Sequence, residues 1–161
     1  MNNVLNWINE KIITDKENKL TPEDVENIRD FSLLWNLFES LCCNKKAYIS
    51  EINKVIDKKI DLFNENDYID IFNYFMERYQ NNATFEKLNL SNGSKKLVQK
   101  VLKREYTDKN NKLKFIMYII HRYRNNLFHG EKDMRYIKFQ KENFEITNKF
   151  LMCFIEKCKG N

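Results

Sequence analysis

Glycine and proline are scarce in this chain of 161 residues, and that scarcity restricts the folds it can adopt. There are three glycines and one proline. Sandwiches and barrels of short strands need many tight turns, which depend on these two residue types. The composition therefore predicts long helices joined by polar loops. With 42% hydrophobic and 14% aromatic residues, the chain is too apolar for disorder, and we expect one domain, residues 1–161, around a single core.

Apolar residues recur at helical spacing along most of the chain. Thr21-Pro22-Glu23-Asp24 predicts a helix start, with Thr21 as the N-cap and acids near the positive end of the helix dipole. Leu88–Ser94 is the clearest loop, and we expect Ser94 to cap a helix over Lys95–Glu105. Thr107-Asp108 can start the next helix. The sequence predicts an all-α fold, an antiparallel bundle of five to seven helices.

The most informative stretch for function is residues 122–130, Arg-Tyr-Arg-Asn-Asn-Leu-Phe-His-Gly, which follows the apolar run Phe115–Ile120. It holds two of the six arginines and one of the two histidines. Arginine binds phosphate in a fixed, bidentate geometry, and histidine transfers protons near neutral pH. Gly130 suits a C-terminal helix cap. These residue types indicate a phosphate-handling site at the end of a helix.

The spacing within this stretch can be followed on an ideal helix, with about 100° between successive residues. Arg122, Asn126 and His129 then form one polar column beside the apolar face. Arg124 lies roughly 140° from His129, so it joins the column only where the last turn unwinds or a second copy of the helix packs alongside. A simpler interpretation stays open, because a helix C-terminus attracts cations and these residues would then merely end the helix.

Arg124-Asn125 followed by His129, at the end of an apolar helix, resembles the Arg-x4-6-His motif of the HEPN superfamily, in which a polar residue, often asparagine, follows the arginine. The likeness extends to a motif in the penultimate helix, followed by one amphipathic helix. It also includes an early aromatic helix that ends in an acid, Phe31–Glu39. Arg122 satisfies the looser spacing as well, so the motif arginine is not settled, although the Arg-Asn pair favours Arg124.

The resemblance implies a metal-independent endoribonuclease of a toxin–antitoxin or anti-phage system, which needs no cofactor and leaves 2′,3′-cyclic phosphate ends on RNA. His129 would act as general base on the 2′-hydroxyl or as general acid on the leaving 5′-oxygen. Arg124 would stabilise the charge of the transition state, and Asn125 would orient the phosphate or the imidazole. Arg122 and Asn126 would support the site.

Because one histidine cannot easily act as base and acid in a single encounter, the resemblance also implies a homodimer with the two motifs facing across the interface. A second function remains open. The chain would then be a catalytically silent HEPN module that binds nucleic acid or a partner protein, such as an antitoxin or a nucleotidyltransferase-type partner.

Glu39 and His121 are the other polar residues that bear on this site. Glu39 follows Trp35 by one turn at the edge of the apolar stripe, where it either pairs with Arg124 and orients it or extends into solvent. We expect His121 to lie on the helix surface without a direct role, and Tyr123 to point toward the core.

Charge and cysteine content exclude several other classes. The net charge of +5 is mild, and we expect the basic cluster Lys95–Arg104 to be a solvated helix face. Cys42, Cys43, Cys153 and Cys158 do not match zinc spacing, so we expect reduced thiols and no metal site. No signal peptide or membrane-spanning run is visible, which predicts a cytoplasmic protein.

Overall fold

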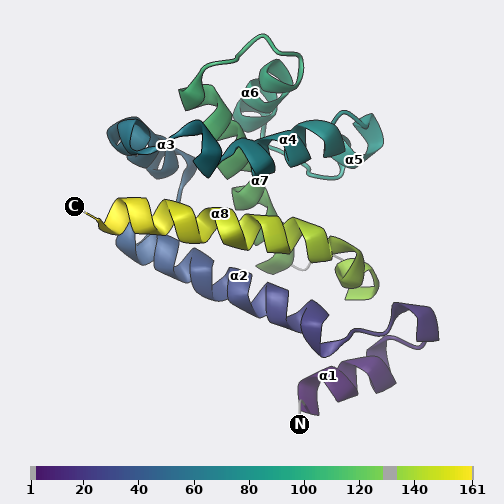
Figure 1. Ribbon diagram of the computed structural model, residues 1–161. Coiled ribbons are helices and arrows are strands. Elements are labelled where there is room, and N and C mark those ends of the chain that lie inside the picture. The colour runs from purple at the N-terminus through teal and green to yellow at the C-terminus, as the bar shows by residue number, and fades with distance from the viewer. Residues whose placement is uncertain (1–2, 129–133, 161) are drawn as a thin grey trace.

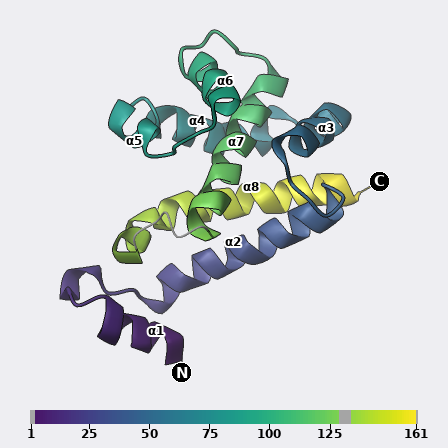
Figure 2. The same ribbon diagram turned by 180° about the vertical axis from the view of Figure 1, so that it is seen from behind.

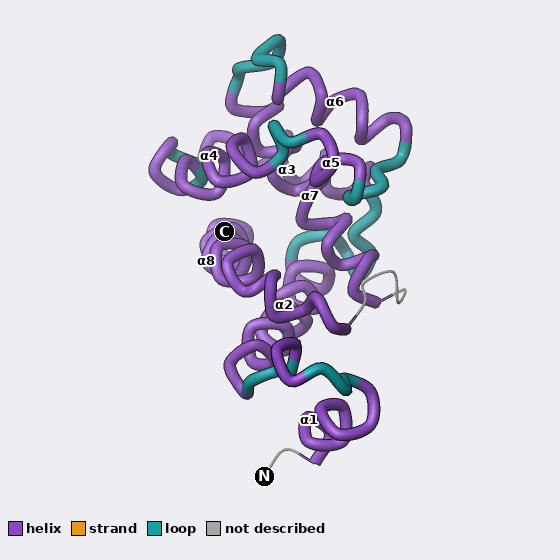
Figure 3. The backbone as a smooth tube through the Cα atoms, turned by 90° about the vertical axis from the view of Figure 1, so that its right-hand side faces the viewer, coloured by secondary structure: helices purple, strands orange, loops and turns teal. Residues whose placement is uncertain are grey.

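The computed structural model describes residues 3–128 and 134–160, and within these ranges the chain is all-α, without a strand (Figures 1 and 3). The α-helices are α1 (Asn3–Trp7), α2 (Pro22–Leu41), α3 (Ile49–Lys59), α4 (Ile69–Arg78), α5 (Asn82–Glu86), α6 (Asn92–Leu102), α7 (Lys109–Phe128) and α8 (Lys141–Lys159). A π-helical turn spans Ile8–Ile12, and 3-10 turns span Lys16–Asn18, Ile60–Leu62, Glu65–Asp67 and Met134–Gln140. The eight α-helices described exceed the expected maximum by one, because α5 forms a separate short helix.

The two longest helices begin at the residues that the sequence predicted. Thr21 caps α2: its hydroxyl accepts the Asp24 N–H at 3.3 Å, and the Asp24 carboxylate accepts the Thr21 N–H at 2.8 Å. Asp108 precedes α7, and its carboxylate accepts the Asn111 N–H at 3.0 Å. Each side chain satisfies a backbone donor that would otherwise lack a partner in the first turn.

The start of α6 differs from the prediction. The helix begins at Asn92, and the carbonyl of Ser91 accepts the Lys95 N–H at 2.7 Å. Ser94, which we expected to be the cap, lies inside the helix and is buried. Ser91 and Ser94 look equally suited to a cap in the sequence. What separates them is burial, since Ser94 lies one turn before the fully buried Val98 on the same face.

Helix α7 passes through the middle of the molecule. It connects the layer formed by α3, α4, α5 and α6 with the pair formed by α2 and α8 (Figures 1 and 2). Every side chain of Phe115–Ile120 is buried. A helix that is apolar all round needs neighbours on all sides, and α7 has them in α3, α4 and α6. None of the described helices is long and apolar enough to cross a membrane.

Helices α2 and α8 lie side by side and run in the same direction (Figures 1 and 2). Phe31 packs on Phe144 with ring centroids 5.1 Å apart, and Phe38, farther along α2, packs on Phe154 at 5.4 Å. The expectation of antiparallel neighbours is therefore wrong for this pair. Short loops make neighbouring helices antiparallel, but α2 and α8 are separated by most of the chain, so no short loop fixes their direction.

Candidate functional site at the end of helix α7

Arg124 lies in the last turns of α7, half-buried, with no carboxylate partner among the described residues. One guanidinium nitrogen, Nη1, donates to Asn125 Oδ1 at 3.2 Å. The guanidinium carbon is 5.4 Å from the ring centroid of Phe128, which is 54% exposed. The Nε atom is buried without a hydrogen-bond partner. A half-buried guanidinium with no anion among the described residues is suited to pairing with an anion from elsewhere, such as a ligand phosphate.

Arg122 has a different environment, although it is only two residues away. Its Nε donates to the carbonyl of Leu88 at 2.6 Å, so it ties α7 to the segment between α5 and α6. The two candidate arginines therefore diverge around the helix, as an ideal helix requires for residues two apart.

Asn126 does not lie on the exposed polar column that the helical wheel predicts. It is only 4% exposed, and its Oδ1 is buried without a hydrogen-bond partner. Tyr123, one turn earlier, is buried as expected, and its hydroxyl contacts that of Tyr79 on α4. The wheel misplaces Asn126 because α4 and α8 enclose this part of α7 on the Tyr123 side, where Tyr123 also packs on Phe144. His129 and Gly130, the rest of the predicted motif, lie outside the described residues.

Glu39 neither pairs with Arg124 nor extends fully into solvent, the two alternatives that the sequence left open. Its carboxylate is half-buried and accepts the backbone N–H of Ala47 at 3.4 Å, so it ties the segment after α2 back onto that helix. No ion pair joins it to Arg124, although both residues are described. Glu39 therefore supports the loop around Cys43–Ala47.

His121 is less exposed than the helix-surface position predicted for it. Its ring lies 5.9 Å from that of Trp35, centroid to centroid, and it is half-buried between α2 and α7. Burial, together with the charges of Arg124 and Arg122 and against the opposing charge of Glu39, lowers the pKa of His121 to about 4. The imidazole is therefore neutral at neutral pH. Arg124 lies three residues later on the same side of the helix, so its charge acts on His121. The burial of His121 comes from Trp35 of α2, which no spacing within α7 indicates.

The basic cluster and the cysteines form no further candidate site among the described residues. In the basic cluster, Lys95 pairs with Glu86 at 2.9 Å and Lys100 lies 4.8 Å from the ring centroid of Tyr106, contacts typical of a solvated helix face. The four cysteines are free thiols. Within residues 3–128 and 134–160, no three His, Cys, Asp or Glu side chains come together in a way that could hold a metal ion.

Comparison with known proteins gave no match to a family model, a curated protein or a solved structure. The site therefore has to be interpreted from its own residues.

Proposed function

We propose that this chain is a metal-independent endoribonuclease of the HEPN type, acting in an anti-phage or toxin–antitoxin system. The observation that carries the proposal is the state of Arg124. Among the residues that the structure describes, no carboxylate pairs with its guanidinium, which lies beside the exposed ring of Phe128, five residues before His129 in the sequence. A cation next to an exposed aromatic ring offers a phosphate and its base the two contacts that single-stranded RNA prefers.

The chemistry follows from the residue types. The 2′-oxygen of a ribose attacks the adjacent phosphorus, and the bond to the 5′-oxygen of the next nucleotide breaks. His129 removes the 2′-proton or protonates the leaving oxygen. Arg124 stabilises the charge on the phosphoryl oxygens. Asn125 accepts a hydrogen bond from Arg124 and orients its guanidinium. The products carry a 2′,3′-cyclic phosphate and a free 5′-hydroxyl.

We take Arg124 as the motif arginine, because Arg122 is engaged with the Leu88 carbonyl. On this proposal the finer fold is HEPN-like, and two copies form a homodimer in which the motifs face each other. The second copy supplies the second histidine that acid and base catalysis need. An antitoxin or a nucleotidyltransferase-type protein would be the regulatory partner in the cytoplasm.

The test is cleavage of several RNAs in EDTA by the purified protein and by the Arg124→Ala and His129→Ala variants. The proposal expects cleavage by the wild type and loss in both variants. Equal activity in all three would identify a contaminant. A folded wild type that binds RNA without cleaving it would refute the enzyme and favour the catalytically silent module.

A further inference from the structure

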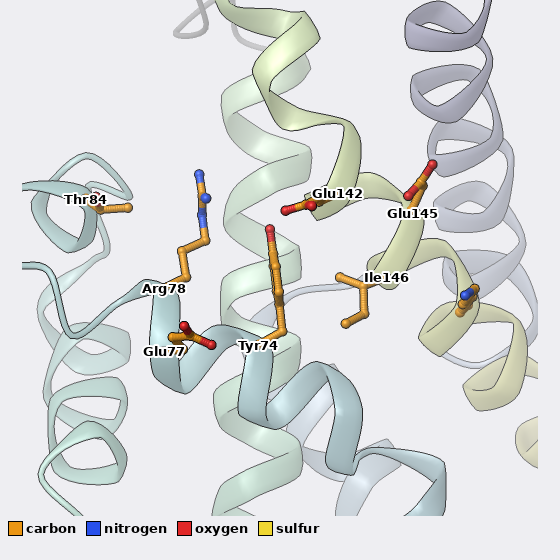
Figure 4. A pocket seen from close by; sticks show the side chains of 8 residues that line it. Tyr74, Glu77, Arg78, Thr84, Glu142, Glu145 and Ile146 are labelled. Atoms are coloured by element: carbon orange, nitrogen blue, oxygen red, sulfur yellow. The ribbon is translucent and has the colours of Figure 1, made fainter.

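A cavity of about 640 Å³ lies between α4, the start of α5 and the first turns of α8. Its lining includes Tyr74, Arg78, Thr84, Glu142, Glu145 and Lys149, and Figure 4 shows several of these side chains directed into it. Cavities of this volume hold small ligands in many proteins. The proposed ribonuclease mechanism uses none of these residues.

Arg78 is the central group of this cavity. Its guanidinium extends into the space between Thr84 and Glu142 (Figure 4). The side chain is half-buried, and its Nε is buried without a hydrogen-bond partner. No carboxylate of the described residues forms an ion pair with it, although glutamates line the same cavity. Arginine stays charged in proteins, so a partly desolvated guanidinium without an anion is a binding group for one.

The wall behind Arg78 is held rigidly. The guanidinium carbon lies 5.9 Å from the ring centroid of Tyr79, and the Tyr79 hydroxyl is hydrogen-bonded to that of Tyr123 on α7. Tyr74 donates to Asn143 Oδ1 at 2.6 Å, which ties α4 to α8 at the cavity edge. A guanidinium with such supports loses little side-chain freedom when an anion binds.

The Glu142 carboxylate faces Arg78 from the α8 side (Figure 4). The Tyr74 phenol lies between the two charges: burial raises its pKa, Arg78 lowers it and Glu142 raises it. Figure 4 shows the Tyr74 hydroxyl directed toward Glu142. Two cations, Arg78 and Lys149, and three glutamates, Glu77, Glu142 and Glu145, line the cavity. This balance disfavours a polyanion and favours a ligand that carries both signs of charge.

We propose that this cavity binds a small zwitterion whose phosphate or carboxylate is held by Arg78 and whose ammonium group faces Glu142 and Glu145. The anionic group accepts hydrogen bonds from the Arg78 guanidinium, which lines the cavity. The ammonium group is attracted mainly by Glu142, which forms no ion pair with a described residue, whereas Glu145 lies 3.9 Å from Lys141 Nζ, outside the cavity lining. The cavity selects a zwitterion over a simple anion, because an anion is attracted by Arg78 but repelled by the glutamates.

The test is calorimetric titration of the full chain with phosphoethanolamine, inorganic phosphate and β-alanine. Phosphoethanolamine and β-alanine distinguish a phosphate from a carboxylate as the anionic group. The zwitterion with the preferred anion is expected to bind at least tenfold more tightly than inorganic phosphate. Arg78→Gln is expected to weaken it at least tenfold, because a charge-assisted bidentate contact is lost. Glu142→Gln is expected to remove most of the advantage over inorganic phosphate.

Arg29→Gln is the matched control, because Arg29 is an exposed arginine on α2 outside the cavity. Its affinities are expected to equal those of the wild type. Arg78→Lys keeps the positive charge but loses the planar, bidentate donor geometry of the guanidinium, and it is expected to retain part of the affinity. Urea unfolding of each variant shows that it is folded. The proposal is overturned if no probe binds, if Arg78→Gln binds as the wild type does, or if the glutamate variant leaves the preference unchanged. It is also overturned if an RNA oligonucleotide, rather than the zwitterions, depends on Arg78.

Discussion

Lowering the pH from 7 to 4.5 is expected to destabilise this fold through His121. The folded-state pKa of about 4 lies below the ordinary value of 6.5, because burial and the charges of Arg124 and Arg122 oppose protonation. Between these two values the unfolded chain binds the proton and the folded chain does not. The part of the folding stability that depends on neutral His121 is therefore fully present above pH 6.5 and is lost as the pH falls toward 4.

The size of the effect follows from the same two values. A gap of 2.5 units between about 4 and 6.5 corresponds to about 3 kcal/mol once the pH is below both. At pH 4.5 most of this is already lost, so the expected decrease in unfolding free energy is about 2 to 3 kcal/mol. That is a large part of the stability of a domain of this size.

The assay is urea unfolding of the wild type and of His121→Gln at intervals from pH 7 to pH 4.5. Fluorescence reports the transition, because Trp35 lies against His121. The difference between the two unfolding free energies isolates His121, since His129 and every carboxylate are present in both proteins. The difference should shrink by about 2 to 3 kcal/mol on acidification. Parallel stability curves would refute the buried, neutral imidazole.

Three further results are expected. Tyr79→Phe removes one partner of the buried bond with Tyr123 and should cost about 1 to 2 kcal/mol in urea unfolding, with the double phenylalanine variant costing less than the sum of the two single changes. Thr21→Ala removes the N-cap bond to Asp24 and should cost about 1 kcal/mol, whereas an unchanged unfolding midpoint would show that the cap is dispensable. Phe128→Ala should leave stability within about 0.5 kcal/mol, because the ring is 54% exposed, but should weaken RNA binding by about 1 to 3 kcal/mol in a filter-binding assay; equal binding would remove Phe128 from the site.

The helices that depend on local signals could be predicted from the sequence. Thr21 caps α2 with its hydroxyl, and Asp108 caps α7 with its carboxylate. Each oxygen accepts from a free N–H group in the first turn, a contact within four residues. The choice between Ser91 and Ser94 for α6 depends on which of them the core covers, and that is decided by distant residues. The parallel pairing of α2 and α8 is equally non-local.

The same division applies to the candidate site. Arg124 donates to Asn125 near the end of α7, whereas the spacing from Arg124 to His129, on which the motif depends, extends outside the described residues. Asn126 and His121 were misplaced because a helical wheel assumes one buried face. Helix α7 is enclosed by Tyr79 on one side and Trp35 on another, so both residues are buried or half-buried. No pattern within α7 itself records those neighbours.

The proposed ribonuclease activity is tested most directly by the identity of the 3′ ends left on RNA after incubation with the protein in EDTA. We expect 2′,3′-cyclic phosphates, formed at least a hundredfold more slowly by Arg124→Ala and at an unchanged rate by the Arg29→Ala control. Ends with a 3′-hydroxyl, or equal rates for the two arginine variants, would contradict a transesterification assisted by Arg124.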